Sequence, residues 1–391
     1  MLLAEIVSTV GTALTMVALP WFVLTTSGSP ARAALVMAAE VAPVALFGVL
    51  SGSWAERMGA RRWMLLSDGC RAPLVALIPT LSALGMLPFW MLLLAVFVLG
   101  SFTAPYFASQ QVLLAEVVGE DQAALSQATS VLQSATRLTL LIGPPAAGLL
   151  IAALGAPAVL YLDAASYLAA VALIATKTPK SGIAANAVST GVLAGLKTLY
   201  ADRLLGMWTT ASLLSEAAYQ ALFIAIPVLV ITRYHASATL AGLLLGAFGA
   251  GAAGGSLLAA YLARSQPAQR LAIIGKSSQV PVFLLLILPL SPLGFGAVML
   301  SLGVFNGIAN GPSFAVRLAR IPVQMRAKTL TAATTITMLG ATMGLVLAGI
   351  ALQALTARTV FVAMGVLQLA SVSLFTAGYI NRQTATPTTA R

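Results

Sequence analysis

The sequence predicts an all-α membrane protein with twelve transmembrane helices, arranged as two pseudo-symmetric six-helix bundles. Of its 391 residues, 59% are hydrophobic and only 8% are charged, whereas about a quarter of the residues in a soluble domain are charged. Apolar runs close to the length of about 20 residues that a bilayer-spanning helix needs recur from one end of the chain to the other. They contain Gly and Pro and lack the alternation of short strands, which excludes a transmembrane barrel.

Twelve apolar segments account for most of the chain, with short connections between them. The predicted spans are 2–25, 33–53, 64–84, 89–113, 127–153, 158–175, 204–231, 238–262, 271–289, 294–315, 329–354 and 359–380. The longest connection divides the chain into an N-terminal bundle (1–175), a cytosolic linker (176–203) and a C-terminal bundle with a short cytosolic tail (204–391). The halves resemble each other, since Gly52 lies at the end of the second span and Gly255 lies near the end of the eighth. A duplicated bundle of this kind is typical of transporters that alternate access to a midplane site.

Basic residues are concentrated on one side of the predicted spans. Of 21 Lys and Arg residues, 17 lie on the side of both termini or just inside the following helix, including Arg71 and Lys276. Three lie on the opposite side (Arg32, Arg233 and Arg358), and Arg137 falls within the fifth span. This asymmetry predicts that both termini are cytosolic in a bacterial plasma membrane. The net charge of +11 is therefore an orientation signal and does not indicate nucleic-acid binding.

The connection after the second span carries a charged motif, GSWAERMGARR (52–62). It resembles the signature of the major facilitator superfamily, G-x-x-x-D-R-x-G-R-R, with Glu56 at the position of the aspartate. The matching positions are Gly52, Arg57, Gly59, Arg61 and Arg62. The resemblance implies a conformational latch, in which the acid meets the start of the eleventh helix and locks the outward-facing state; such a contact is favourable because a helix N-terminus attracts negative charge. The alternative is a basic loop that only anchors the chain.

The N-terminal half is similar to a narrower type within that superfamily, the bacterial enterobactin exporters and macrolide-efflux proteins. The stretches that carry this similarity are ALPWFVLTTSGSP, AAEVAPVALFGVLSG, LLSD and LLIGPPAAG. The last one partly matches the antiporter signature G-P-x-x-G-G through Gly143, Pro144 and Gly148, with Ala147 in place of a glycine. We expect the prolines to bend the fifth span, although such a kink also occurs without any antiport function.

Ionisable residues within spans are costly and mark functional sites. The sequence offers four candidates for proton coupling: Glu216, near the centre of span seven, Glu40, Asp163 and Glu5. Burial in an apolar cavity favours the neutral form of a carboxyl group, and a nearby cation opposes this. Arg137 is expected to be the buried partner of one of these acids. The alternative for each acid is a structural pair or a side chain that reaches the membrane interface.

Further polar and aromatic residues are expected to line the cavity. Resemblance to the family implies that spans seven and ten border a central cavity, and the candidates there are Trp208, Tyr219, Gln220, Asn306 and Asn310. The two asparagines are four residues apart and therefore share one helix face. Hydrogen bonding between helices would explain these polar residues equally well.

The motifs that are missing limit the possible functions. The sequence contains no G-x-x-x-x-G-K-[ST] loop for ATP, and its one histidine, His235, and one cysteine provide neither a metal-ligand pattern nor a catalytic triad. We therefore expect no enzyme activity, cofactor or metal. The sequence predicts a monomeric, proton-coupled exporter of lipophilic small molecules, with the bilayer and protons as its other partners. The alternatives are a proton symporter or facilitator that imports a small solute and, more remotely, a receptor or scaffold.

Overall fold

The computed structural model describes residues 2–48, 58–118, 122–178 and 192–383. Every regular element in these ranges is helical, which confirms the all-α prediction. The helices are α1 (Leu2–Ser27), α2 (Pro30–Phe47), α4 (Ala60–Ala83), α5 (Phe89–Ser101), α6 (Thr103–Val118), α7 (Gln122–Leu154), α8 (Ala156–Lys177), α9 (Val192–Ala201), α10 (Arg203–Thr232), α11 (Ala238–Leu262), α12 (Ala268–Leu285), α13 (Pro292–Arg320), α14 (Arg326–Ala354) and α15 (Ala357–Gln383), with a short 3-10 helix, η1 (Val323–Met325), before α14.

The described residues contain ten helical segments that are long and apolar enough to cross a membrane, and α5 and α6 together form one of them. The other two predicted spans correspond to α7, whose apolar part is the shorter segment Leu141–Leu154, and to α12. Polar side chains such as Lys276 and Gln279 lower the hydropathy of α12. The twelve predicted spans therefore each fall on a helix or on a pair of consecutive helices. The additional helix, α9, lies in the segment that the sequence suggested only as a linker.

Local signals explain where several helices begin. Ser29 caps α2 by accepting a hydrogen bond from the backbone N–H of Arg32, and Pro30 follows it at the first helical position. Ser291 caps α13 in the same way. Gly59 precedes α4 with φ +81°, a conformation that side chains with a Cβ atom rarely adopt. Glycine at this position of the charged motif therefore suits the tight turn that leads into α4.

The chain separates into two compact units. The first comprises Met1–Thr190 and Ile226–Gly246, and the second comprises Gly191–Ala225 and Ala247–Arg391. The predicted division at 175 and 204 remains a prediction.

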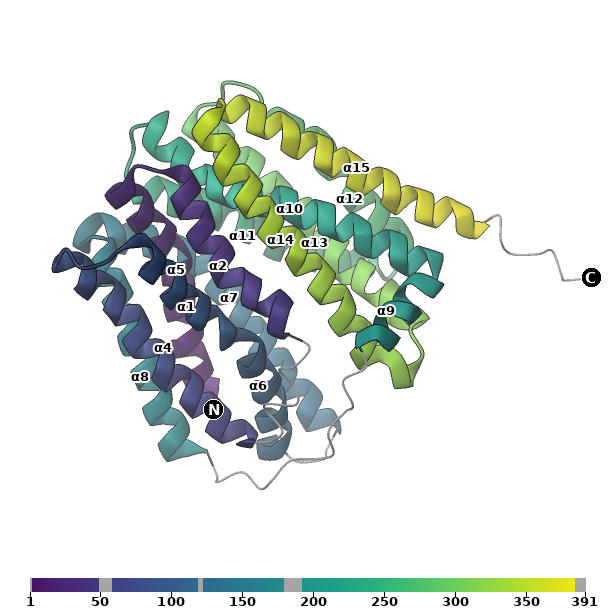
Figure 1. Cartoon of the computed structure of the whole chain (residues 1–391). Helices are drawn as coiled ribbons and strands as arrows, with labels where there is room; N and C mark the ends of the chain where they lie inside the picture. Colours follow the sequence, from purple (N-terminus) through teal and green to yellow (C-terminus); the bar gives the residue numbers. More distant parts are fainter. Residues whose placement is uncertain (1, 49–57, 119–121, 179–191, 384–391) are drawn as a thin grey trace, which may run out of the picture. The chain divides into compact units, whose positions relative to one another are not determined.

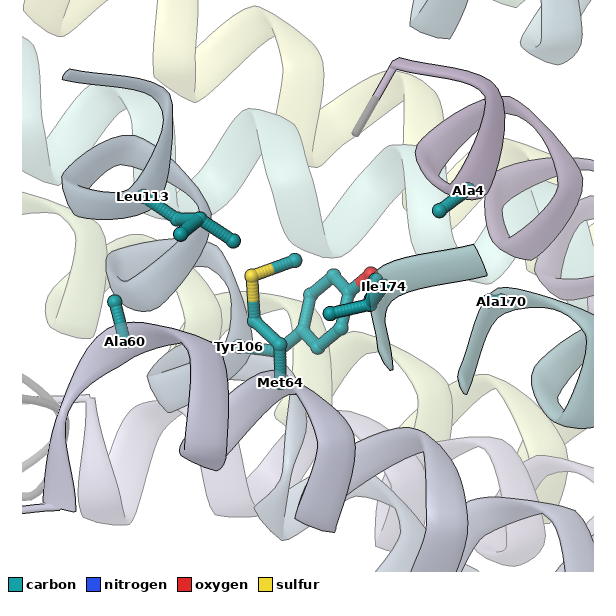
Figure 2. Close-up of a cluster of buried hydrophobic side chains, with 7 residues drawn as sticks. All are labelled: Ala4, Ala60, Met64, Tyr106, Leu113, Ala170 and Ile174. Atoms are coloured by element: carbon teal, nitrogen blue, oxygen red, sulfur yellow. The ribbon is translucent and has the colours of Figure 1, made fainter. Parts of the chain in front are cut away.

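In the first unit, α1 packs against α7 and α8, α4 packs against α8, and α2 packs against α5 (Figure 1). At one end of this unit, Met64 of α4, Tyr106 of α6 and Ile174 of α8 meet in a buried cluster (Figure 2). Tyr106 belongs to this cluster and donates a hydrogen bond from its hydroxyl group to the buried Glu5 of α1.

In the second unit, α12 packs against α13 and α15, and α9 packs against α14. Glycines bring α11 and α13 close together: a Cβ atom on Gly251 or Gly255 of α11 would collide with backbone atoms of α13, and one on Gly303 or Gly307 would collide with backbone atoms of α11. Both helices therefore use glycines four residues apart to bring their backbones together, as in membrane helix pairs generally.

Candidate functional site

A cavity of about 90 Å³ lies within the first unit, among α1, α2, α4, α5, α6 and α8. Its walls carry two acids, one arginine and three aromatic rings: Glu5, Glu40, Arg71, Tyr106, Phe107 and Tyr167. A water molecule needs about 10–15 Å³ on this scale, so the cavity has room for several waters or for a compact polar group.

Arg71 of α4 is the central cation of this site. It is buried, donates a hydrogen bond from Nη2 to Thr103 Oγ1 (3.1 Å), and has Nη1 3.9 Å from a carboxylate oxygen of Asp68. Its guanidinium carbon lies 5.1 Å from the ring centre of Tyr106 and 5.7 Å from that of Tyr167, within the range of cation–π attraction. Its Nε has no hydrogen-bond partner among the described residues.

Glu5 of α1 is buried beside this arginine. Its carboxylate accepts hydrogen bonds from the hydroxyl of Tyr106 (3.0 Å) and from the side-chain amide of Gln110, both on α6. Two donors from one neighbouring helix hold this carboxylate in a fixed position.

Asp163 of α8 is also buried, and Thr15 of α1 donates a hydrogen bond of 2.5 Å to it. Ser166 donates a second one of 3.2 Å. Gly11 allows this packing, because a Cβ atom there would collide with the side chains of Asp163 and Ser166. The hydrogen bonds of Asp163 therefore indicate a structural role. Its charge still acts electrostatically on Glu40.

Glu40 of α2 differs from the other acids. It is partly exposed where it lines the cavity, and within the described part of the chain its carboxyl group has no hydrogen-bond partner. Its backbone is fixed by α5, since a Cβ atom on Gly100 would collide with the carbonyl oxygen of Glu40. The cavity thus contains one acid that is positioned by its main chain and whose carboxyl group remains available.

The second unit contains another acid within a helix, the half-buried Glu216 of α10. Its carboxylate accepts a hydrogen bond from Gln220 (3.2 Å), and Lys276 of α12 is the cation that acts on it. Lys276 is buried and donates a hydrogen bond to Ser215 (3.1 Å). The predicted neighbour Gln220 therefore does contact Glu216.

Two further predicted cavity residues of this unit lie close together. Tyr219 is buried among Phe223, Phe248 and Phe283, with its hydroxyl near Asn306. Asn310 donates a hydrogen bond to Asn306 (2.7 Å), which confirms that they share a helix face.

Trp208 differs from its predicted position on a cavity wall. Its indole ring is fully buried, stacks on Phe375 at 3.9 Å and donates its N–H to the Phe375 carbonyl (3.0 Å). Because its ring packs within the core and its N–H group has a hydrogen-bond partner there, Trp208 is a packing residue.

Part of the charged motif and one candidate side chain lie outside the described residues. These are Gly52, Glu56 and Arg57, and the side chain of Arg137 on α7. Within the described part, Arg62 is exposed and Arg61 donates a hydrogen bond to the carbonyl oxygen of Ala175 (2.8 Å). A cation is favourable there, because Ala175 lies in the last turn of α8.

The residues of the partial antiporter signature lie in a close helix contact. The helix α7 continues through Pro144. A Cβ atom on Gly143 would collide with Ala13 of α1, and one on Gly148 would collide with backbone atoms at the start of α11, where Gly242 in turn approaches the carbonyl oxygen of Pro144. These residues of α7 therefore give the start of α11 a tightly fitted surface.

Three ionisable residues of these sites were not among the predicted site residues. Arg71 and Lys276 were counted only as orientation signals, yet both are buried, and Asp68 is buried beside Arg71. The i, i+3 spacing of Asp68 and Arg71 within an apolar span was the signal that could have identified them. Across the described residues, no group of three His, Cys, Asp or Glu side chains could hold a metal ion.

Comparison with known proteins places these sites in context. The chain matches the family model of the Major Facilitator Superfamily over residues 1–345. Among solved structures, it is similar to the nucleoside transporter NupG (TM-score 0.76, 13% identity, 96% of this chain and 98% of that one). It is also similar to a bacterial homologue of the human lysosomal transporter Spinster (TM-score 0.77, 13% identity, 100% of this chain and 97% of that one). At these identities the likeness concerns the fold alone.

Curated relatives are similar over part of the sequence. The multidrug efflux pump Tap of Mycolicibacterium fortuitum is 27% identical over 227 residues, which cover 56% of each chain. Tap of Mycobacterium tuberculosis (strain ATCC 25618 / H37Rv) is 25% identical over 170 residues, 42% of this chain and 40% of that protein. The chain thus spans about half the length of the curated relatives that it matches.

Proposed function

Since the chain belongs to the major facilitator superfamily, we propose that it works as a proton-coupled exporter of lipophilic small molecules. It is a multi-pass membrane transporter and not an enzyme. The similarity to the multidrug efflux pump Tap supports the direction of transport in this proposal.

The observation that carries the proposal is a half-buried acid that is under the electrostatic influence of a buried cation from another helix. Glu216 and Lys276 belong to α10 and α12, and each side chain also has a polar partner on α10. An acid in such a setting can alternate between a neutral form and an ionised form that Lys276 stabilises. This is the property that a coupling residue needs.

The protein would exchange substrate for protons because the two exclude one another from the site of Glu216. When the site faces the more acidic exterior, Glu216 takes up a proton as the substrate leaves. When the site faces the cytosol, the proton departs as the next substrate binds. Each substrate exported is thereby coupled to proton entry, because the carrier returns in the protonated form.

The charged motif is proposed to act as the latch of one access state. Glu56 would meet a helix N-terminus in that state only, which is worth about 0.3–1 kcal/mol when exposed. Glu56→Gln and Arg57→Ala are expected to slow transport while the amount of folded protein stays unchanged. Unaltered transport by both variants would argue against a latch.

Both termini are proposed to be cytosolic, and the protein is proposed to work as a monomer in a bacterial plasma membrane. The basis for the orientation is the distribution of Lys and Arg between the two sides. After removal of Arg71 and Lys276, which are buried, 15 cations remain on the cytosolic side against three on the other (17 − 2 = 15).

A transport assay in everted vesicles tests the function. Vesicles with an imposed pH gradient are supplied with a panel of lipophilic drugs and siderophores. Accumulation that depends on both the protein and the gradient is expected. Gradient-driven movement in the opposite direction would favour a symporter, and movement that ignores the gradient would favour a facilitator.

A further inference from the structure

The cavity of the first unit carries more negative groups than its arginine can neutralise. Arg71 acts electrostatically on four carboxyl groups: Glu5, Glu40, Asp68 and Asp163. Two of these, Glu5 and Glu40, line the cavity together with Arg71, so that two ionised carboxylates there would exceed the single positive charge among the described side chains of its wall. Charges in a low-dielectric interior need compensation by protons or by another cation.

Of the two acids that line the cavity, Glu40 is the one available to such a cation. Glu5 is bonded to Tyr106 and Gln110, Asp163 is bonded to Thr15 and Ser166, and Asp68 faces Arg71. Glu40 lines the cavity without a hydrogen-bond partner in the described ranges. The buried Arg71 reaches the same cavity with an Nε that is also unpaired in the described part.

The remaining walls suit an organic cation better than a hydrated metal ion. Tyr106, Phe107 and Tyr167 line the cavity, and aromatic rings attract compact ammonium groups through their faces. On α1, Ser8, Thr9 and Thr12 add hydroxyl groups to the wall. A space of about 90 Å³ holds a small head group, while the apolar part of such a ligand would have to extend beyond it.

We infer that this cavity binds the cationic head group of an amphiphilic ammonium or amine substrate, with Glu40 as its counter-ion. The inference rests on the proposed export function and specifies its substrate class. Arg71 also lines the cavity and donates a hydrogen bond from its guanidinium group to Thr103. The bound cation replaces a proton in the charge balance of the cluster, so that cation and proton compete within the first unit independently of Glu216.

Direct binding to the full-length protein in lipid nanodiscs tests this inference. The probes are hexyltrimethylammonium and hexyldimethylamine N-oxide, which have nearly the same size, although only the first carries a net charge. Calorimetric titration, corrected with empty nanodiscs, is expected to show at least about tenfold tighter binding of the cation. Equal affinity for the two probes would overturn the inference.

Variants test whether Glu40 causes the preference for the charged probe. Glu40→Gln is expected to remove the tenfold preference, whereas Glu40→Asp should retain most of it. Asp202→Asn, which removes one carboxylate from the second unit, is the matched control and should leave the preference unchanged. A preference that survives in Glu40→Gln would also overturn the inference, and a thermal melting curve confirms that each variant is folded.

The outcome is separable from that of the proposed export function. Gradient-driven export of lipophilic compounds in vesicles, combined with equal binding of the two probes, would contradict this inference alone. Selective binding of the cation without gradient-driven export would contradict the proposed coupling and leave the cation site intact.

Discussion

The Nζ atom of Lys276 on α12 lies 3.1 Å from Oγ of Ser215, the residue directly before Glu216 on α10. The hydrogen bond to Ser215 ties a buried cation of α12 to the helix that carries the half-buried Glu216, on which Lys276 acts electrostatically. Because the ammonium group is bonded to Ser215 and the carboxylate to Gln220, neither group depends entirely on the other. When the acid changes its charge, the lysine still has Ser215 as its hydrogen-bond partner.

Glu216→Gln imitates the permanently protonated acid and should abolish uphill export driven by a pH gradient. Proton release on substrate addition should disappear with it, because the amide has no proton to exchange. Both are measured in reconstituted vesicles with a pH-sensitive dye. Full gradient-driven export by this variant would exclude Glu216 as the coupling residue and make Glu40 the next candidate.

Lys276→Met removes the cation that stabilises the ionised form of Glu216. Gradient-driven export should fall by about tenfold, which corresponds to about 1.4 kcal/mol. Lys276→Arg retains the charge and is the matched control. Equal export rates for the two variants would show that the charge at this position has no part in coupling.

Gly255→Ala should destabilise the second unit, because its new Cβ atom would press on the backbone of Val304 in α13. Overpacking of this kind costs about 1–3 kcal/mol. Gly254→Ala is a close control, since the neighbouring glycine has nothing within 4 Å. Thermal melting of the purified variants should show a lower midpoint for Gly255→Ala only.

Asp202→Ala tests the start of α10. Asp202 accepts hydrogen bonds from the backbone N–H groups of Leu204 and Leu205 and forms an ion pair with Arg320 at 2.8 Å. Loss of the cap should cost about 0.5–2 kcal/mol, and loss of this partly exposed ion pair should add at most about 1 kcal/mol. Arg320→Ala removes only the ion pair. Thermal melting of this variant should therefore show the smaller loss of stability, and that loss should depend on the salt concentration.

A single cysteine at position 181, introduced as Ser181→Cys with Cys70 replaced by Ser, tests the orientation. Membrane-impermeant maleimide should label it in everted vesicles and not in intact cells. Labelling from outside intact cells would invert the proposed topology.

Hydropathy and length were sufficient to predict the spanning helices, since a span must satisfy its own backbone hydrogen bonds in lipid, but not the shorter α9. They could not predict which side chains meet. Arg71 and Lys276 follow basic loops and look like orientation signals, and only the packing of α4 and α12 shows that they are buried. The burial of Trp208 was equally hidden, because a helix that is apolar on all sides gives no indication of which face points inwards.

The contact between Gly100 and the main chain of Glu40 has a practical consequence for engineering. Since the backbone of α5 holds this acid in place, the large apolar side chains on the exposed face of the same helix, such as Trp90 and Leu94, can vary freely. A mutagenesis library directed at that face would adapt the protein to lipids of different composition without displacing the acid.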